Sequence, residues 1–206
     1  MNQQKAIKGR GTHTNPHNRF QSKISVLDVS GEGEEPAPHP ATEYIAQKSR
    51  SIVSSNKSPD VPFRLSINPY QGCEHGCVYC FARPTHEYLE LSSGLDFETK
   101  IHYKQNAATL LETWLSRPGY QCEVIALGAN TDPYQQVERQ LRITRSLLEV
   151  MRNYRQPVSI ITKGSGILRD LDILSDMAKQ NLVNVMITVT SLDPVLKNIL
   201  EPRAAA

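Results

Sequence analysis

Residues 68–80 read Asn-Pro-Tyr-Gln-Gly-Cys-Glu-His-Gly-Cys-Val-Tyr-Cys, and this stretch decides most of what the sequence predicts. It holds three of the four cysteines of the chain, Cys73, Cys77 and Cys80, in the spacing C-x3-C-x2-C. Three thiolates on one short loop can bind three corners of a cubane iron–sulfur cluster, whereas an ordinary electron-transfer cluster takes four cysteines. One iron then stays open to another ligand. We predict a [4Fe-4S] cluster on Cys73, Cys77 and Cys80.

The cysteine spacing, with the aromatic residue Tyr79 directly before the last cysteine, resembles the signature of the radical S-adenosylmethionine (SAM) enzymes. This resemblance implies a second cofactor, SAM, whose amino and carboxylate groups chelate the open iron. It also implies the reaction, in which an electron from the cluster cleaves SAM to a 5′-deoxyadenosyl radical that abstracts hydrogen from a substrate. The cofactors carry this chemistry, the protein positions them, and a reductant such as flavodoxin or ferredoxin is the implied partner.

Further motifs resemble the spore photoproduct lyase-like branch of that superfamily. They are residues 66–73, 130–132, 162–163 and 201–202, and residues 8–20 resemble those of an uncharacterised bacterial set in the branch. The true lyases carry a reactive cysteine near the end of the second strand, where this chain has Ala129. Membership of the branch therefore does not give the substrate.

A zinc site is the alternative interpretation of the cysteine run. His75 lies inside the run, and zinc sites with three cysteines and one histidine exist. Structural zinc sites usually pair two short knuckles a dozen or more residues apart, however, and here the candidates share one loop. The second function class that stays open is a non-catalytic iron–sulfur or zinc-binding module whose basic N-terminal arm contacts nucleic acid.

Composition places the chain among soluble globular proteins of the cytoplasm. The N-terminus is polar and shows no signal peptide. No apolar run has the length of a membrane-spanning helix, so we expect no membrane contact. Thiols in the cytoplasm stay reduced, and this favours metal ligands over disulfides. The net charge of +2 over 206 residues is too small to indicate nucleic acid by itself.

The first 60 residues are predicted as a polar N-terminal arm and linker, and residues 61–206 as the core domain. The start of the arm carries five basic residues and no acidic residue among them: Lys5, Lys8, Arg10, Arg19 and Lys23. Contact with phosphates is one interpretation, and a solvated, disordered arm is the one we favour. Residues 28–42 are acidic and proline-rich, which is typical of a linker.

From residue 61 onward, strand-like and helix-like patterns alternate. Strands are expected at residues 63–68, 124–128, 158–162 and 183–189, and helices at 105–116, 138–154 and 167–180, with a further helix starting at Asp193-Pro194. This alternation predicts an α/β fold with parallel strands. The family resemblance makes it a partial parallel (β/α) barrel, truncated after four of six units. The uncovered fourth strand is then a possible surface for self-association.

Polar and small residues follow the predicted strands at the end where ligands gather in parallel barrels. With Tyr79, these are the candidate contacts to SAM: Gly128, Asn130, Thr131 and Asp132 after the second strand, Lys163 after the third, and Thr190 and Ser191 after the fourth. Gly128–Asp132 takes the place of the Gly-Gly-Glu motif of the family. Cys122 lies at the opposite end of the second strand, so we predict a small buried hydrophobic residue and no fourth ligand.

Overall fold

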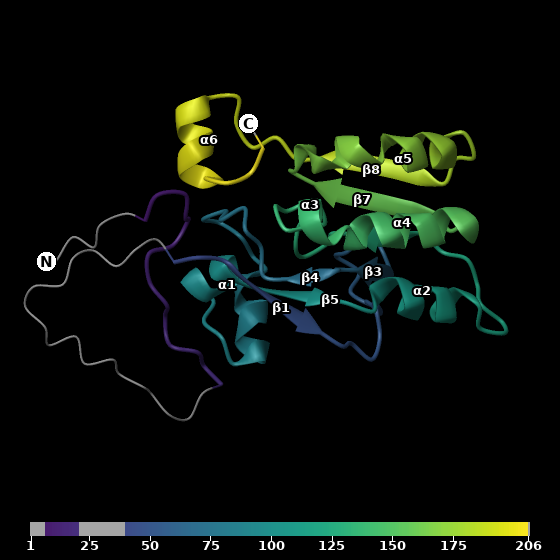
Figure 1. The fold of residues 1–206 in the computed structure, drawn as a ribbon, viewed down its shortest axis with the longest axis horizontal. Coiled ribbons are helices and arrows are strands. Elements are labelled where there is room, and N and C mark those ends of the chain that lie inside the picture. The colour runs from purple at the N-terminus through teal and green to yellow at the C-terminus, as the bar shows by residue number, and fades with distance from the viewer. Residues whose placement is uncertain (1–6, 21–39, 206) are drawn as a thin grey trace, which may run out of the picture.

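A computed structural model describes residues 7–20 and 40–205 of the chain. Its larger sheet has five strands in the order β2-β3-β6-β7-β8, of which β3, β7 and β8 are labelled in Figure 1. These strands are β2 (Val53–Ser55), β3 (Leu65–Ile67), β6 (Ile125–Leu127), β7 (Val158–Thr162) and β8 (Val183–Ile187). The last four run parallel to one another, and β2 runs antiparallel to β3. The four parallel strands are those that the sequence predicts.

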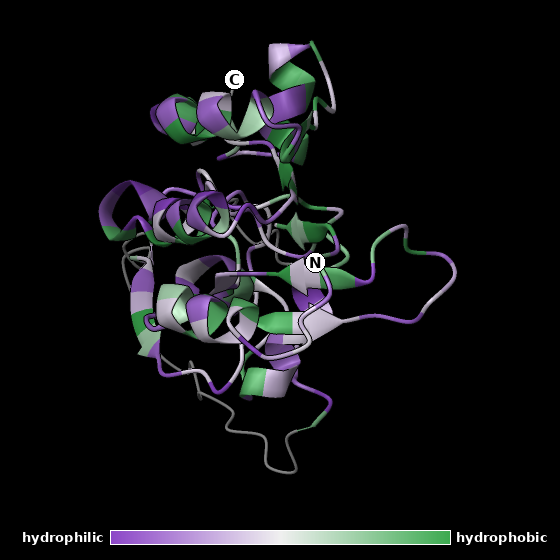
Figure 2. Cartoon of the chain, turned by 90° about the vertical axis from the view of Figure 1, so that its right-hand side faces the viewer, coloured by the Kyte–Doolittle hydropathy of each residue, from purple (hydrophilic) through white to green (hydrophobic). Residues whose placement is uncertain are grey.

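The helices that connect the parallel strands also lie where the sequence places them. They are α2 (Ala107–Leu115), α3 (Glu138–Leu141), α4 (Ile143–Asn153), the 3-10 helix η2 (Ser165–Asp170) and α5 (Leu171–Ala178). The helix predicted over residues 138–154 is divided, because Arg142 takes a left-handed backbone conformation with φ of 52°. The helices carry both hydrophobic and hydrophilic residues (Figure 2), and α4 buries Ile143, Leu147, Leu148 and Met151 at the spacing of an amphipathic helix.

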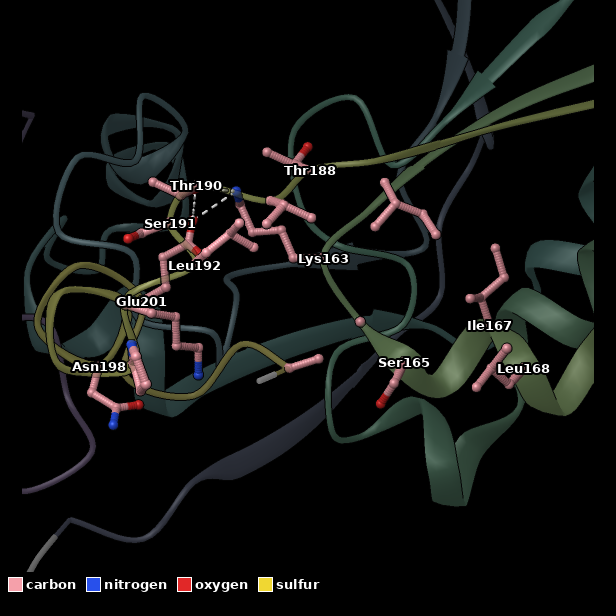
Figure 3. A pocket seen from close by; sticks show the side chains of 16 residues that line it. Lys163, Ser165, Ile167, Leu168, Thr188, Thr190, Ser191, Leu192, Asn198 and Glu201 are labelled. Carbon is pink, nitrogen blue, oxygen red and sulfur yellow. Dashed lines mark hydrogen bonds and ion pairs between the residues drawn. The ribbon is translucent and has the colours of Figure 1, made fainter.

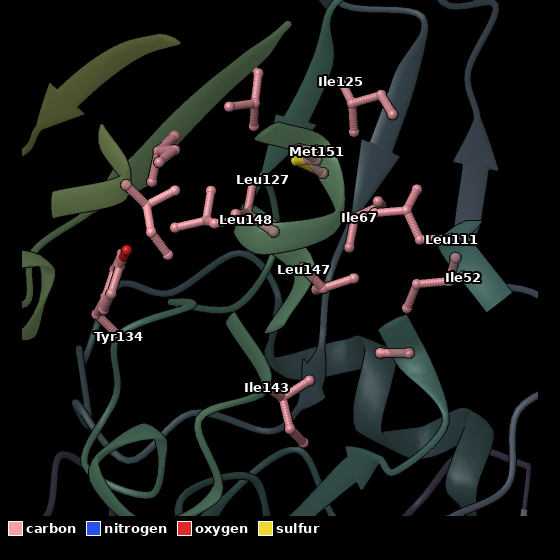
Figure 4. Packing of buried hydrophobic residues seen from close by; sticks show 14 of the residues in the cluster. Ile52, Ile67, Leu111, Ile125, Leu127, Tyr134, Ile143, Leu147, Leu148 and Met151 are labelled. Carbon is pink, nitrogen blue, oxygen red and sulfur yellow. The ribbon is translucent and has the colours of Figure 1, made fainter. Parts of the chain in front are cut away.

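The main core lies between this sheet and the connecting helices. Leu127 and Ile160 on the strands are fully buried, as are Leu147, Leu148 and Met151 on α4 (Figure 4). Burying one side chain of this kind stabilises the fold by roughly 1.5–3 kcal/mol. The core therefore fixes the strands, and the strands in turn fix the loops that follow them.

A second sheet of three strands has the order β1-β5-β4. It consists of β1 (Glu43–Gln47), β4 (Tyr70–Gln71) and β5 (Lys100–Lys104). Strands β1 and β2 both precede Val61, so regular structure begins before the domain start predicted from the sequence. Most residues of β1 are exposed, so burial of apolar side chains does not explain this strand. β1 is stabilised by backbone hydrogen bonds, since it pairs with β5 along its whole length.

Two short helices follow the cysteines, η1 (Arg83–Leu89) and α1 (Leu95–Thr99). The last helix, α6 (Pro194–Leu200), begins as predicted, with Asp193 accepting hydrogen bonds from the backbone N–H groups of Val195 and Leu196. None of the helices in the described ranges is both long and apolar enough to cross a membrane.

Apolar side chains remain exposed on β8 and α6. Ile187 on β8 is 62% exposed, Leu192 before α6 is 92% exposed and Ile199 is 62% exposed. Within residues 7–20 and 40–205, β7 is the only strand that pairs with β8, so its other edge is open. Self-association through that edge stays a prediction.

The part of the N-terminal arm that is described does not behave as a solvated arm. Residues 7–20 lie against the loop that carries the three cysteines (residues 72–82) and against α1, and Asn18 is buried. The amide of Asn18 donates hydrogen bonds to the carbonyl oxygens of Glu87 and Leu91, at 3.0 and 2.9 Å. Polar side chains of this segment therefore pair inside the fold. Lys5, Lys23 and most of the predicted linker lie outside the described residues.

Candidate cofactor site

The cysteine loop (residues 72–82) turns sharply on two glycines. Gly72 and Gly76 have positive φ values of 87° and 67°. A Cβ atom on Gly72 would lie 2.9 Å from the carbonyl oxygen of Phe97, so only glycine fits this position. The backbone N–H of Cys73 donates to the same carbonyl at 2.9 Å. The loop is therefore fixed in place by α1 at the point where the cysteines begin.

Burial controls the chemistry of the first two thiols. Cys73 and Cys77 are buried, and Cys80 is partly exposed. Burial, with the nearby carboxylate of Asp132, raises the pKa of Cys73. Burial, with the carboxylate of Glu201, raises the pKa of Cys77 to about 12. Without a cation these thiols are neutral, whereas a bound metal deprotonates a coordinating thiol. The donor set thus suits a cationic metal centre.

The three cysteines line one cavity of about 240 Å³. Four further predicted residues line it beside Tyr79: Gly128, Asn130, Asp132 and Lys163. The cavity therefore brings together the cysteine loop and the loops after β6 and β7, as the strand-end argument predicts. Thr162, part of the 162–163 motif but given no role from the sequence, also lines it, and so does Thr188, which sequence reasoning did not single out. Thr162 ends β7 and Thr188 directly follows β8, and this position is the signal that points to them.

Two of the residues after β6, Gly128 and Asp132, are needed for the fold itself, and the sequence alone does not indicate this. A Cβ atom on Gly128 would lie 2.6 Å from the carbonyl oxygen of Ile161, so packing already requires glycine there. Asp132 joins the ends of β6 and β7, because it accepts from the hydroxyl of Thr162 at 2.7 Å and from the N–H of Lys163 at 2.7 Å. The structure gives both residues a role without a ligand.

Thr131 does not line the cavity. Its hydroxyl donates to the carbonyl oxygen of Tyr70 at 2.7 Å, and its side chain is buried. Thr190 and Ser191 line a neighbouring groove of about 570 Å³, which lies between the end of β8, η2 and α6 (Figure 3). The groove and the cavity share Lys163 and Thr188, so a molecule in one lies next to a molecule in the other.

Lys163 is held by an acidic residue that sequence reasoning left without a role. The Nζ atom of Lys163 lies 2.7 Å from the carboxylate of Glu201 (Figure 3). Thr190 donates to the same carboxylate at 2.5 Å, and so does the hydroxyl of Tyr79. Burial alone would lower the pKa of Lys163, but the hydrogen bonds to Glu201 and Tyr79 outweigh it and raise the pKa. Lys163 and Glu201 are therefore both charged, and both line the neighbouring groove.

His75, the residue behind the zinc interpretation, is buried with Nδ1 3.5 Å from Asp132. Burial lowers its pKa, although Asp132 opposes the effect, so the imidazole is neutral. In the described part of the chain, no three His, Cys, Asp or Glu side chains converge as ligands of a single ion. A cubane needs a different arrangement, since each thiolate binds its own iron.

Cys122 differs from its prediction. It is exposed, not buried, because β6 begins only at Ile125 and the residues directly before that strand lie mostly at the surface without regular structure. It lies before the start of β6, whereas the cavity residues follow the end of that strand.

The comparisons with known proteins agree with this arrangement. The model of the radical SAM superfamily matches residues 67–205. The chain is 42% identical over 149 residues to an uncharacterized protein of Mycobacterium bovis, which covers 71% of this chain and 44% of that protein. It is 26% identical over 160 residues to an uncharacterized protein of Methanocaldococcus jannaschii, which covers 78% and 56%. The chain thus spans about half the length of the curated relatives it matches.

Among solved structures, the chain is similar to spore photoproduct lyase complexed with dinucleoside spore photoproduct. The TM-score is 0.55 at 14% sequence identity, over 79% of this chain and 44% of that one. A likeness at this identity concerns the fold, and it agrees with a partial parallel (β/α) barrel.

Proposed function

Since the chain belongs to the radical SAM superfamily, we propose that it holds a [4Fe-4S] cluster on Cys73, Cys77 and Cys80 and binds SAM beside it. When bound, the two cofactors supply reductive cleavage of SAM to a 5′-deoxyadenosyl radical, which abstracts hydrogen from a substrate. One observation carries this proposal: three cysteines of one short loop face a single cavity together with the loops after β6 and β7.

Different side chains around the cavity contact different parts of the two cofactors in this proposal. The three thiols would hold the cluster, and a cubane held by three cysteines keeps one iron for another ligand. Lys163 offers a positive charge for the carboxylate of SAM, and charge-assisted hydrogen bonds of this kind are the stronger ones. Asn130 is exposed at the cavity and offers an amide to polar groups of SAM. Tyr79, 51% exposed, offers a ring against which the cofactor packs.

Glu201 determines how strongly the ammonium group of Lys163 can attract a further carboxylate. In the cofactor-free protein its carboxylate neutralises Lys163. The carboxylate of SAM would share the ammonium group of Lys163 with Glu201. An ammonium group has three hydrogen-bond donors, so it can contact more than one acceptor. Thr190 and Ser191 then contact the part of SAM, or of the substrate, that extends into the groove along β8.

Two partners belong to the same proposal. The reaction consumes an electron, so a reductant such as flavodoxin or ferredoxin has to reach the cluster. The substrate has to reach the cavity, and the groove that shares Lys163 and Thr188 with it is the route we propose.

The non-catalytic metal module with a nucleic-acid-binding arm is less well supported. In the described part of the arm, Arg10 donates to the backbone of Glu98 at 2.7 Å and to the hydroxyl of Thr42 at 2.9 Å. A guanidinium engaged in this way has fewer donors left for a phosphate. This observation favours the radical SAM function over the alternative.

Anaerobic reconstitution with iron and sulfide tests the ligand set. We expect about four irons and four sulfides per chain for the wild type, as a cubane requires. Cys77→Ala should lose most of the iron, while Cys122→Ala, the matched control on an exposed thiol, should keep it. A full cluster in Cys77→Ala would exclude the proposed ligands. Stoichiometric zinc with no iron in the wild type would favour the metal module.

A further inference from the structure

The N-terminal segment (residues 7–20) meets the cysteine loop at a distance that excludes side chains. A Cβ atom on Gly11 would lie 1.8 Å from the carbonyl oxygen of Gly76, between Cys73 and Cys77 of the loop. A Cβ atom on Gly94 would lie 2.1 Å from the carbonyl oxygen of Thr14. Glycine permits so close an approach of two backbones. The two contacts therefore define one specific path for the segment.

A buried carboxylate connects the segment to the loop. Glu98 on α1 is fully buried, and its two oxygens accept hydrogen bonds from both sides. From the segment, the N–H of Gly11 and the hydroxyl of Thr12 each donate at 3.0 Å. From the loop side, Arg83 donates at 2.6 Å. Buried charges are stable when they are paired and hydrogen-bonded in this way.

Arg83 links Glu98 to the backbone of Cys77. Its Nε and one terminal nitrogen donate to the carbonyl oxygen of Cys77, at 3.2 and 2.9 Å. Its other terminal nitrogen donates to the carbonyl oxygen of Gly94 at 3.2 Å. A continuous chain of hydrogen bonds thus runs from Thr12 through Glu98 and Arg83 to the backbone of Cys77.

Further contacts extend along the segment. The N–H of Leu95 donates to the carbonyl oxygen of Thr14 at 3.1 Å. Asn15 and Asp96 exchange two hydrogen bonds, at 3.0 and 2.8 Å. The segment is thereby attached to both α1 and the residues before it, and not only at Gly11.

We infer that the N-terminal segment is an integral part of the cysteine site: through Glu98 it holds the cysteine loop in the closed conformation that buries Cys73 and Cys77. Glu98 is a positioning residue in this account, since it acts on Cys77 through Arg83. The hydrogen bonds and close contacts are features of the structure itself, whereas their importance for a cluster rests on the proposed function. The expected consequence is protection of the ligand thiols, and of the cluster they hold, from solvent and oxygen.

Thiol accessibility in the cofactor-free, full-length protein tests the inference. Iodoacetamide alkylation of each cysteine is followed over time by mass spectrometry. In Gly11→Val we expect Cys73 and Cys77 to react about tenfold faster, because local opening of the loop exposes them. Cys122 is exposed and serves as the internal standard, with an unchanged rate. Lys8→Ala alters an exposed side chain of the same segment and should leave every rate unchanged.

A pair of milder variants separates the hydrogen bond from general damage. Thr12→Val keeps the shape of the side chain but removes its donor to Glu98, so we expect rates about threefold above wild type. Thr12→Ser keeps the hydroxyl and should restore the wild-type rates. If Gly11→Val does not fold, as judged by circular dichroism, the Thr12 pair decides the question alone.

Unchanged alkylation of Cys73 and Cys77, in a variant whose segment is cut faster by protease, would overturn the inference. This readout needs neither cluster nor SAM, so it is independent of the proposed function. With reconstituted protein, Gly11→Val should bleach faster in air than Lys8→Ala. A wild type that binds no cluster but shows the expected alkylation pattern would remove the proposed function and leave the positioning role of the segment.

Discussion

The Nζ atom of Lys163 lies 2.7 Å from the buried carboxylate of Glu201, and this ion pair joins the end of β7 to the end of α6. The hydroxyls of Tyr79 and Thr190 donate to the same carboxylate. Since Tyr79 directly precedes Cys80, the cysteine loop is attached to a residue near the other end of the described chain. The charge that we assign to SAM recognition is therefore positioned by residues of three other segments, Tyr79, Thr190 and Glu201, and not by its own loop alone.

Replacing Lys163 with methionine should weaken SAM binding. The substitution keeps most of the side-chain volume but removes the charge offered to a carboxylate. Loss of one charge-assisted hydrogen bond costs about 1.5–3 kcal/mol, which corresponds to roughly tenfold to a hundredfold in affinity. Equilibrium dialysis of reconstituted protein under anaerobic conditions measures it. Lys179→Met, at an exposed position after α5, is the control, and equal affinity of both variants would contradict the role of Lys163.

Gly128→Ala should destabilise the fold far more than Gly119→Ala. Both glycines have positive φ, 87° and 74°, so both substitutions carry backbone strain of about 1–2 kcal/mol. At Gly128 the new methyl group also lies 2.5 Å from the ring of Pro133, whereas at Gly119 no atom lies within 4 Å. Overpacking adds about 1–3 kcal/mol. Urea unfolding compares the two, and equal midpoints would contradict the packing role of Gly128.

Arg169→Met should lower the free energy of unfolding by about 3–5 kcal/mol, because it leaves buried carboxylates without their partner. Arg169 forms ion pairs with Glu138 at 2.7 Å and with Asp170 at 2.8 Å, and both acidic side chains are almost completely buried. Arg145 still contacts Asp170 at 3.0 Å. Arg139→Met, next to Glu138 but exposed, is the control in the same urea titration. A loss no larger than that of the control would show that the network adapts.

Acid should destabilise the protein partly through His86. Its ring is buried against Phe97, with ring centroids 5.5 Å apart. Burial, with His102 nearby, lowers its pKa from 6.5 to about 4, although Asp96 opposes the shift. The unfolded chain therefore binds this proton more readily. The contribution of His86 is complete above pH 6.5 and decreases as the pH falls toward 4, by at most about 3 kcal/mol.

His86→Leu should flatten that part of the stability profile. Urea unfolding at a series of pH values between 6.5 and 4 measures the slope, and His17→Ala, at an exposed histidine, should keep the wild-type slope. If His86→Leu and the wild type lose stability in parallel over this range, His86 is not the group that titrates.

Local patterns predicted the parallel part of the fold well. Strand β7 has the bounds expected from its apolar run, and α6 begins at the expected Asp193-Pro194. Each of these signals lies within a few residues, and their physical cause is local: burial of a short apolar strand, or capping of a helix. The cysteine spacing likewise identified the loop that lines the cavity.

Long-range polar pairing was the part that sequence reasoning could not predict. Strand β1 is short and mostly exposed, and it is fixed by its pairing with β5, far along the chain. Gly11 and Asn15 were interpreted as parts of a solvated arm, because their partners Glu98 and Asp96 lie more than eighty residues away. The same limit explains Glu201, whose contact with Lys163 no local pattern reveals. Polar residues show no periodicity that points to a distant partner.

The most direct test of the central claim is electron paramagnetic resonance of the reconstituted, reduced protein, measured with and without SAM. The account predicts the signal of a reduced [4Fe-4S] cluster that changes when SAM is added, because SAM binds the iron that Cys73, Cys77 and Cys80 leave open. A cluster signal that is indifferent to SAM, or the absence of any cluster from a folded protein, would contradict it.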